Sequence, residues 1–126
     1  MGEQISVNKK RTESNNMTKI YDDGTDIFQV LDAIKKRAGL FILKNHLDYL
    51  YNFISGYKVL ADATKTEIKN LDRFEQFPSY LKTELNEDYD NTMGWFGYLH
   101  NKYGNEIGFH KFFEFLDKFK DRNDFK

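Results

Sequence analysis

The chain has 126 residues, 19 basic and 20 acidic side chains, and no cysteine. The length predicts one domain that can bury a core without cross-links, and the lack of cysteine excludes disulfides and thiolate sites. The even charge argues against general nucleic-acid binding, which needs a basic surface, and no apolar run reaches the roughly 20 residues of a membrane span.

Residues 1–20 are predicted to form a flexible polar tail, followed by a single helical domain at 21–126. The tail has four basic and two acidic side chains and few apolar ones, a composition typical of disorder. It lacks the apolar stretch of a signal peptide. Together with the missing cysteines, this favours a cytoplasmic protein.

The first helix is expected to begin after the turn Asp22-Asp23-Gly24-Thr25. Asp26 can cap it, and Gln29 three residues later completes a variant of the capping box. Gly39 is predicted to stop the helix in a left-handed conformation. The apolar stripe of this helix comprises Ile27, Val30, Leu31 and Ile34.

Residues 40–43, Leu-Phe-Ile-Leu, are predicted to form a buried connector because no partner strand is evident. A second helix should run from about Asn45 to between Leu60 and Ala63. Gly56 lies inside its pattern, and we expect close approach by another helix there, because an interior glycine costs about 1 kcal/mol relative to alanine. The apolar face comprises Leu47, Leu50, Tyr51, Ile54, Tyr57 and Ala61.

The polar stretch 62–70 either extends the second helix or begins a new one. Pro78 suits the first turn of a short third helix at 78–85, which is followed by a polar loop. Asn91 or Thr92 should cap a fourth helix that ends at Gly104. Asn105 should cap the last helix, at 106 to about 120, and the end of the chain should fray.

Aromatic residues dominate the expected core, with 12 Phe, 8 Tyr and one Trp. In the last helix, apolar residues recur at steps of three and four, which place them on one helical face. The sequence therefore predicts an all-α, single-domain orthogonal bundle of about five helices. The apolar face of the last helix comprises Phe109, Phe112, Phe113, Leu116 and Phe119.

The residue types that usually carry catalysis are sparse. His46, His100 and His110 have no partner histidine at i+3 or i+4, whereas zinc needs three or four converging ligands. The acidic stretches do not fit a calcium loop, and no glycine-rich phosphate loop or nucleophile elbow occurs. We expect a non-enzymatic protein with no cofactor and no small-molecule substrate.

The clearest surface feature is an acidic segment with a central tyrosine and no basic residue between positions 84 and 92. It is either a solvated loop ahead of a helix N-terminus or a docking surface for a basic partner, in which carboxylates orient the encounter and a tyrosine serves as an anchor. Asp22 and Asp23 would join this surface if the fold brought them near. The acidic segment comprises Glu84, Glu87, Asp88, Tyr89 and Asp90.

Segments that cover most of the chain from Asp26 to Phe119 carry a resemblance to a known group of proteins. Within residues 35–41, Ala38, Leu40 and Phe41 stand where that group usually has Pro, Met and Tyr. The segments are Ile27-Phe28 with Val30-Leu31, residues 35–41, Phe53-Ile54 with Gly56-Tyr57, Trp95, and Phe112-Phe113 with Phe115-Leu116-Asp117 and Phe119. Together they resemble small bacterial immunity proteins encoded beside polymorphic toxins, including those of contact-dependent growth inhibition systems.

The resemblance implies a protein that binds one cognate toxin domain, often a nuclease, and neutralises it. A nuclease has a basic contact surface, so the acidic segment is the candidate binding site, and the turn 37–39 with Tyr57 is a rival surface. The alternative is a regulatory or nucleic-acid-associated helical module, in which Lys9, Lys10 and Arg11 in the tail act with residues 35–37. The charge balance counts against direct nucleic-acid binding.

Overall fold

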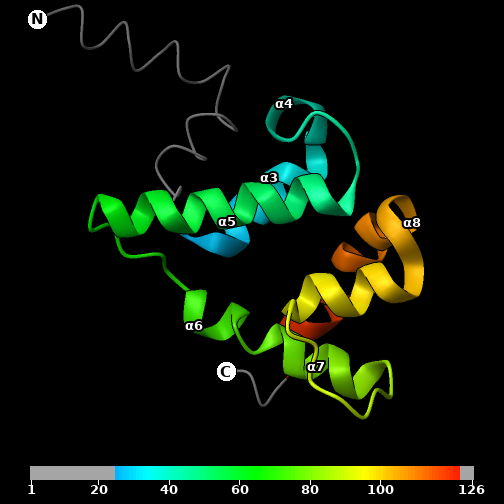
Figure 1. The fold of residues 1–126 in the computed structure, drawn as a ribbon. Coiled ribbons are helices and arrows are strands. Elements are labelled where there is room, and N and C mark those ends of the chain that lie inside the picture. The colour runs from blue at the N-terminus through cyan, green and yellow to red at the C-terminus, as the bar shows by residue number, and fades with distance from the viewer. Residues whose placement is uncertain (1–24, 123–126) are drawn as a thin grey trace, which may run out of the picture.

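The computed structural model describes residues 25–122 (Figure 1). The predicted tail, the turn at Asp22-Asp23-Gly24 and the last four residues lie outside this range. Within it, no strand forms, and the expectation of an all-α bundle is confirmed. The helices are α3 (Ile27–Lys36), α4 (Ala38–Phe41), α5 (Leu47–Ala63), α6 (Leu71–Phe74), α7 (Phe77–Glu84) and α8 (Gly94–Lys120).

Helix α3 begins where the sequence predicts, and a second segment secures its start. The Asp26 carboxylate accepts a hydrogen bond from the backbone N–H of Phe28 at 3.0 Å, which satisfies one of the free donors of the first turn. Asn70, in a left-handed conformation with φ 66°, donates to the same carboxylate at 3.2 Å. The backbone N–H of Ile27 also donates to the Lys69 carbonyl at 3.1 Å. The linker between α5 and α6 therefore fixes the N-terminus of α3.

The region after α3 differs from the sequence prediction. The helix ends at Lys36 with Arg37 as its C-cap at φ −141°, so the predicted stop at Gly39 is wrong and Gly39 lies within α4. The left-handed residue comes later, at Leu43 with φ 76°. The prediction that residues 40–43 form a buried connector is also wrong, because Leu40 and Leu43 are 58% and 72% exposed and only Ile42 of these three is buried.

Helix α5 follows its prediction closely, with one exception. Leu47, Leu50, Ile54 and Ala61 are buried on one face, and α5 ends at Ala63, so that residues 64–70 form a linker. Apart from the backbone of α5 itself, no atom lies within 4 Å of the place where Gly56 would carry a Cβ. The prediction that another helix approaches closely at Gly56 is therefore wrong. The close approach is at Gly108 of α8, where a Cβ would lie 3.0 Å from Cδ2 of Leu47.

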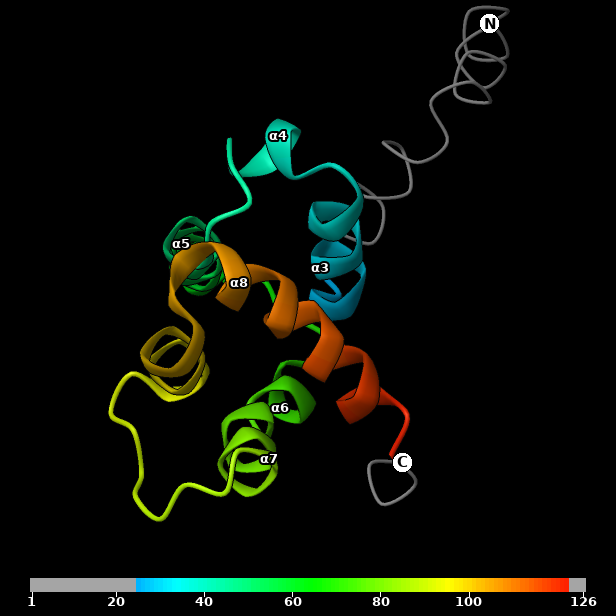
Figure 2. The ribbon, with the colours of Figure 1, turned by 90° about the vertical axis from the view of Figure 1, so that its right-hand side faces the viewer.

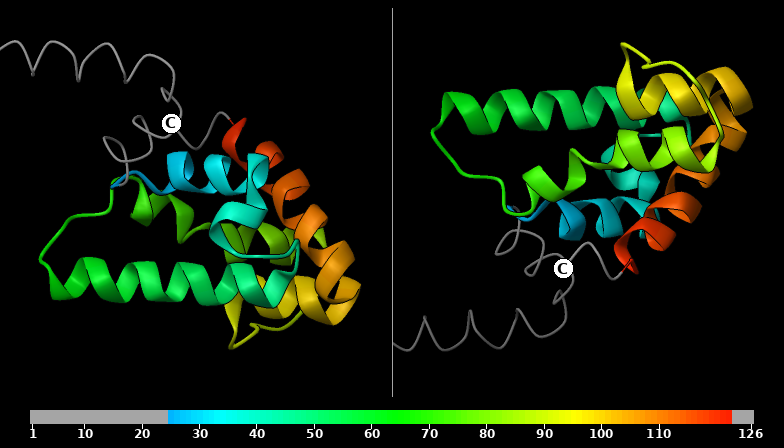
Figure 3. Two further views of the ribbon diagram at one scale, coloured as in Figure 1. Left: turned by 90° about the horizontal axis from the view of Figure 1, so that it is seen from above. Right: turned by 90° about the horizontal axis from the view of Figure 1, so that it is seen from below.

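Helices α3 and α5 lie on opposite sides of the molecule (Figures 2 and 3), with part of α8 between them and α6 and α7 below them in the view of Figure 2. Pro78 occupies the first turn of α7, as predicted, because its missing N–H is not needed there. Helix α8 packs against both α5 and α7.

The predicted fourth and fifth helices form one bent element. Gly104 breaks α8 with φ 79° and ψ −168°, a conformation that favours glycine, and Figure 2 shows the change of direction. Asn105 was expected to cap the helix that follows it. Its side-chain oxygen instead accepts a hydrogen bond from the backbone N–H of Asp48 at 3.0 Å, and so caps the first turn of α5.

The core lies where the two arms of α8 meet α3, α5, α6 and α7. Phe77 and Phe112 are fully buried, with ring centroids 5.5 Å apart and planes at 84°, an edge-to-face arrangement that aromatic pairs favour. The Trp95 ring lies 4.7 Å from that of Phe112. The predicted face of the last helix, Phe109, Phe112, Phe113, Leu116 and Phe119, is buried throughout.

A matched pair of substitutions tests the close approach at Gly108. We expect Gly108→Val to lower the free energy of unfolding by about 1–3 kcal/mol, since extra methyl groups must displace Leu47. Gly56→Val, in the open site on α5, should change it by less than about 0.5 kcal/mol. Urea unfolding measures both variants, and equal effects would show that the contact between α5 and α8 is not tight.

Candidate functional site

The acidic segment extends from the last residue of α7 into the loop that leads to α8. Asn86, at φ 58°, turns the chain away from the helix axis. Four of the five predicted residues, Glu84, Asp88, Tyr89 and Asp90, are exposed, and Glu87 is half-buried. These side chains are therefore accessible to a partner. Asp22 and Asp23 lie outside the described residues.

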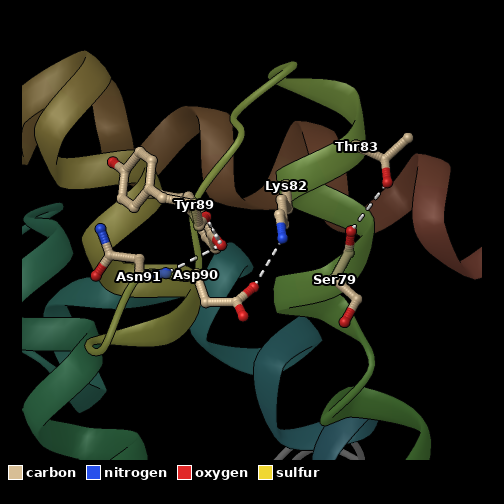
Figure 4. A network of polar contacts seen from close by, with 7 residues as sticks. Ser79, Lys82, Thr83, Tyr89, Asp90 and Asn91 are labelled. Atoms are coloured by element: carbon tan, nitrogen blue, oxygen red, sulfur yellow. Dashed lines mark hydrogen bonds and ion pairs between the residues drawn. The ribbon is translucent and has the colours of Figure 1, made fainter.

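One carboxylate of the segment has a basic partner. Lys82, which lies in the preceding helix α7, donates a hydrogen bond from Nζ to Asp90 Oδ1, with 2.9 Å between the two atoms (Figure 4). This hydrogen bond and the charge of Asp90 raise the pKa of Lys82 above its ordinary value. The sequence interpretation missed the pair because Lys82 lies just outside the acidic run. The segment keeps an excess of negative charge, since it has four carboxylates and Lys82 supplies one positive charge.

The hydroxyl of Tyr98 holds the backbone of the loop in place. It donates to the Tyr89 carbonyl at 2.8 Å and accepts from the Asn91 N–H at 3.0 Å. Tyr98 is 4% exposed, whereas Tyr89 is 43% exposed, and their ring centroids are 5.9 Å apart. The buried core thus positions an exposed aromatic side chain among carboxylates.

Asn91 completes this frame at the start of α8. Its side-chain oxygen accepts a hydrogen bond from the backbone N–H of Met93 at 2.9 Å. The amide group lies directly over Gly97, where any Cβ would overlap it. Gly97 therefore lets the loop pack down on the first turn of α8.

The histidines do not form a metal site. His46 Nε2 lies 3.6 Å from a carboxylate oxygen of Glu106, and both residues border a hollow with His110. His100 is elsewhere and stacks on Phe96. Within residues 25–122, no group of three His, Cys, Asp or Glu side chains is arranged to hold a metal ion.

The two lysines in the last turn of α3 form ion pairs within the fold. Lys35 Nζ lies 3.1 Å from Asp117, and Lys36 Nζ lies 3.1 Å from Asp32. Tyr57 belongs to the rival surface formed with the turn 37–39, and its side chain is half-buried. Burial, together with the charge of Asp26, raises the pKa of the Tyr57 hydroxyl. The basic residues of the tail lie outside the described range.

A cavity that the sequence did not predict lies beside the acidic segment. It has a volume of about 270 Å³ and lies between α5, α6, α7 and the start of α8. Its walls include Tyr51, Phe74 and Trp95, with Glu75 and Lys58 at its edge. A second hollow, beside Leu40 and Leu43, is lined mainly by apolar side chains and borders other residues of α5, Tyr49, Asn52 and Phe53.

Comparisons with known proteins give no relative from which a function can be transferred. No family model matches the chain, and neither a curated protein nor a solved structure matches it significantly. Across residues 25–122, none of the helices combines the length and the apolar character needed to cross a membrane.

We expect Asp90→Asn to lower the pKa of Lys82 toward that of a free lysine, because the variant removes the charge that favours the ammonium form. Since this pKa is raised in the folded state, the pair stabilises the protein below the ordinary lysine pKa. That contribution is lost as the pH rises through the folded-state value. An NMR titration of the Lys82 side chain measures the pKa, and an unchanged value in Asp90→Asn would show that the pair does not persist in solution.

We expect Tyr98→Phe to destabilise the protein by about 1–3 kcal/mol, since it removes two hydrogen bonds, to a part-buried carbonyl and a part-buried N–H, each of which contributes about 0.5–1.5 kcal/mol. Amide hydrogen exchange at Asn91 should accelerate. Tyr89→Phe keeps the ring contact and the backbone bonds, so exchange should not change in this control. Slow exchange at Asn91 in Tyr98→Phe would mean that another group holds the loop.

Proposed function

We propose that this chain is a cytoplasmic, non-enzymatic immunity protein that binds a cognate toxin domain, such as a nuclease, and covers its active site. The observation that carries the proposal is the acidic segment itself. Three of its four carboxylates and Tyr89 are exposed, while Tyr98, from the core, fixes its backbone. A surface held in place before binding loses less entropy when a partner docks.

The chemistry of a nuclease explains why such a surface would inhibit it. A nuclease binds phosphates and therefore has a basic active site. Exposed carboxylates at Glu84, Asp88 and Asp90 would steer the encounter by charge. Tyr89 would then supply the apolar contact that charges alone lack. Inhibition of this kind needs a stable scaffold and no catalytic group.

The alternative is a regulatory or nucleic-acid-associated module, and the ion pairs count against it. Lys35 and Lys36 already face Asp117 and Asp32, so part of the positive charge that would attract phosphates is neutralised. A gel-shift titration with generic DNA and RNA separates the two functions. Binding that weakens steeply with salt would favour the alternative.

Co-expression with the product of the adjacent gene tests the proposal directly. The wild-type chain should form a one-to-one complex with a toxin encoded there and protect the cell from it. Glu84→Lys with Asp88→Lys should weaken binding at least about tenfold, because it replaces attraction with repulsion. These sites leave the Lys82–Asp90 pair intact.

Asp62→Lys with Glu67→Lys is the matched control, since both residues are exposed and the change in charge is the same. It should leave affinity and melting temperature nearly unchanged. Equal losses of affinity in the two double variants would show that net charge matters and that the acidic segment is not the contact. Failure to bind or protect against any neighbouring toxin would overturn the proposed function.

A further inference from the structure

The cavity beside the acidic segment continues the proposed contact surface. Pro78 borders the cavity on α7, one helical turn before Lys82, which pairs with Asp90. Residues four apart lie on the same face of a helix. Thr92 and Met93, which follow Asp90 closely along the chain, form another part of the rim. A partner seated on the acidic segment would therefore also cover the cavity.

The surface that the cavity offers a partner comes mainly from Tyr51 and Met93, because Phe74 and Trp95 are only 2% and 8% exposed. Tyr51 and Phe74 flank Trp95, with ring centroids 5.7 Å and 6.4 Å from the indole. Ile54 and Met93 add aliphatic surface. A volume of about 270 Å³ is at the small end of ligand pockets, which begin near 300 Å³, and is large enough for one inserted side chain.

The edge of the cavity has a carboxylate with a loosely held partner. Lys58 Nζ lies 3.8 Å from Glu75 Oε2, and the two side chains are 43% and 56% exposed. Strong charge-assisted bonds are about 2.7–2.9 Å long, so the ammonium can be displaced into water at little cost. Glu75 is thus available to an incoming cation that binds it more closely.

We propose that the cavity takes an arginine side chain of the basic partner, with the methylene stem against Tyr51 and Met93 and the guanidinium on Glu75. Arginine fits better than lysine, since its planar group stacks on aromatic rings and can contact a carboxylate through two hydrogen bonds. This inference deepens the proposed function and rests on it. Arginine is also enriched among the residues that dominate binding energy at interfaces.

Trp95 gives a direct test, because it is the one tryptophan of the chain and forms a wall of the cavity. Its fluorescence is followed as the full chain is titrated with the blocked tripeptide Gly-Arg-Gly at millimolar concentrations. The same peptide with citrulline, which is uncharged but similar in shape, is the comparison. We expect a saturable change with arginine and an affinity for citrulline at least about tenfold lower, as loss of a charged hydrogen bond implies.

Variants locate the response in the cavity. Glu75→Gln should weaken arginine binding on the order of tenfold, whereas Glu67→Gln, at an exposed site elsewhere, should have no effect. Lys58→Met should strengthen binding because it removes the competing cation. Ser55→Leu, which fills the cavity from α5, should abolish the response, and Ser55→Ala should preserve it. Circular dichroism confirms that each variant is folded.

Equal responses to arginine and citrulline, or an unchanged response in Ser55→Leu, would overturn the assignment of arginine to the cavity. If the wild-type chain nevertheless protects cells from its toxin, only this inference fails. If the chain binds no neighbouring toxin, the proposed function fails whatever the peptide result. The two failures are therefore distinguishable.

Discussion

The break at Gly104 is the constraint on which the rest of the structure depends. A straight helix of 27 residues would be about 40 Å long and could not fold back on a core of this size. The positive φ at Gly104 reverses the chain, and Asn105 fixes the reversal by capping α5. One arm then brings Trp95 and the other brings Phe112 to the same aromatic cluster. Phe77 of α7 completes this cluster.

That arrangement links the core to the surface. Tyr98 lies in the first arm of α8, so the packing that buries its ring also places its hydroxyl under the acidic loop. The cavity depends on the same arm, because Trp95 forms one of its walls. A change that alters the bend would therefore alter both surface features together.

The sequence predicted most of the fold because helical periodicity and N-caps are local signals. Asp26 and Pro78 each act within one turn of their own helix, and both were placed correctly. The glycines were harder to interpret, since Gly56 and Gly108 differ only in what approaches them through space. The exposure of Leu40 and Leu43 likewise depends on how α4 sits over the bundle.

The candidate site was only partly visible in the sequence. The acidic residues lie close together along the chain, within positions 84–90, so the five residues could be named, and the structure shows how far each is exposed. The Lys82–Asp90 pair and the support from Tyr98 join residues on two sides of a turn. No periodic pattern encodes such contacts. Residues of four helices line the cavity, so no single segment of the sequence could predict it.

The Tyr98 hydroxyl holds the loop through hydrogen bonds to two main-chain groups, the carbonyl of Tyr89 and the N–H of Asn91. Main-chain groups are the same whatever residue occupies a position, so mutations at Asp88 or Tyr89 leave these two bonds available. The loop can thus acquire new recognition chemistry while the scaffold beneath it stays constant.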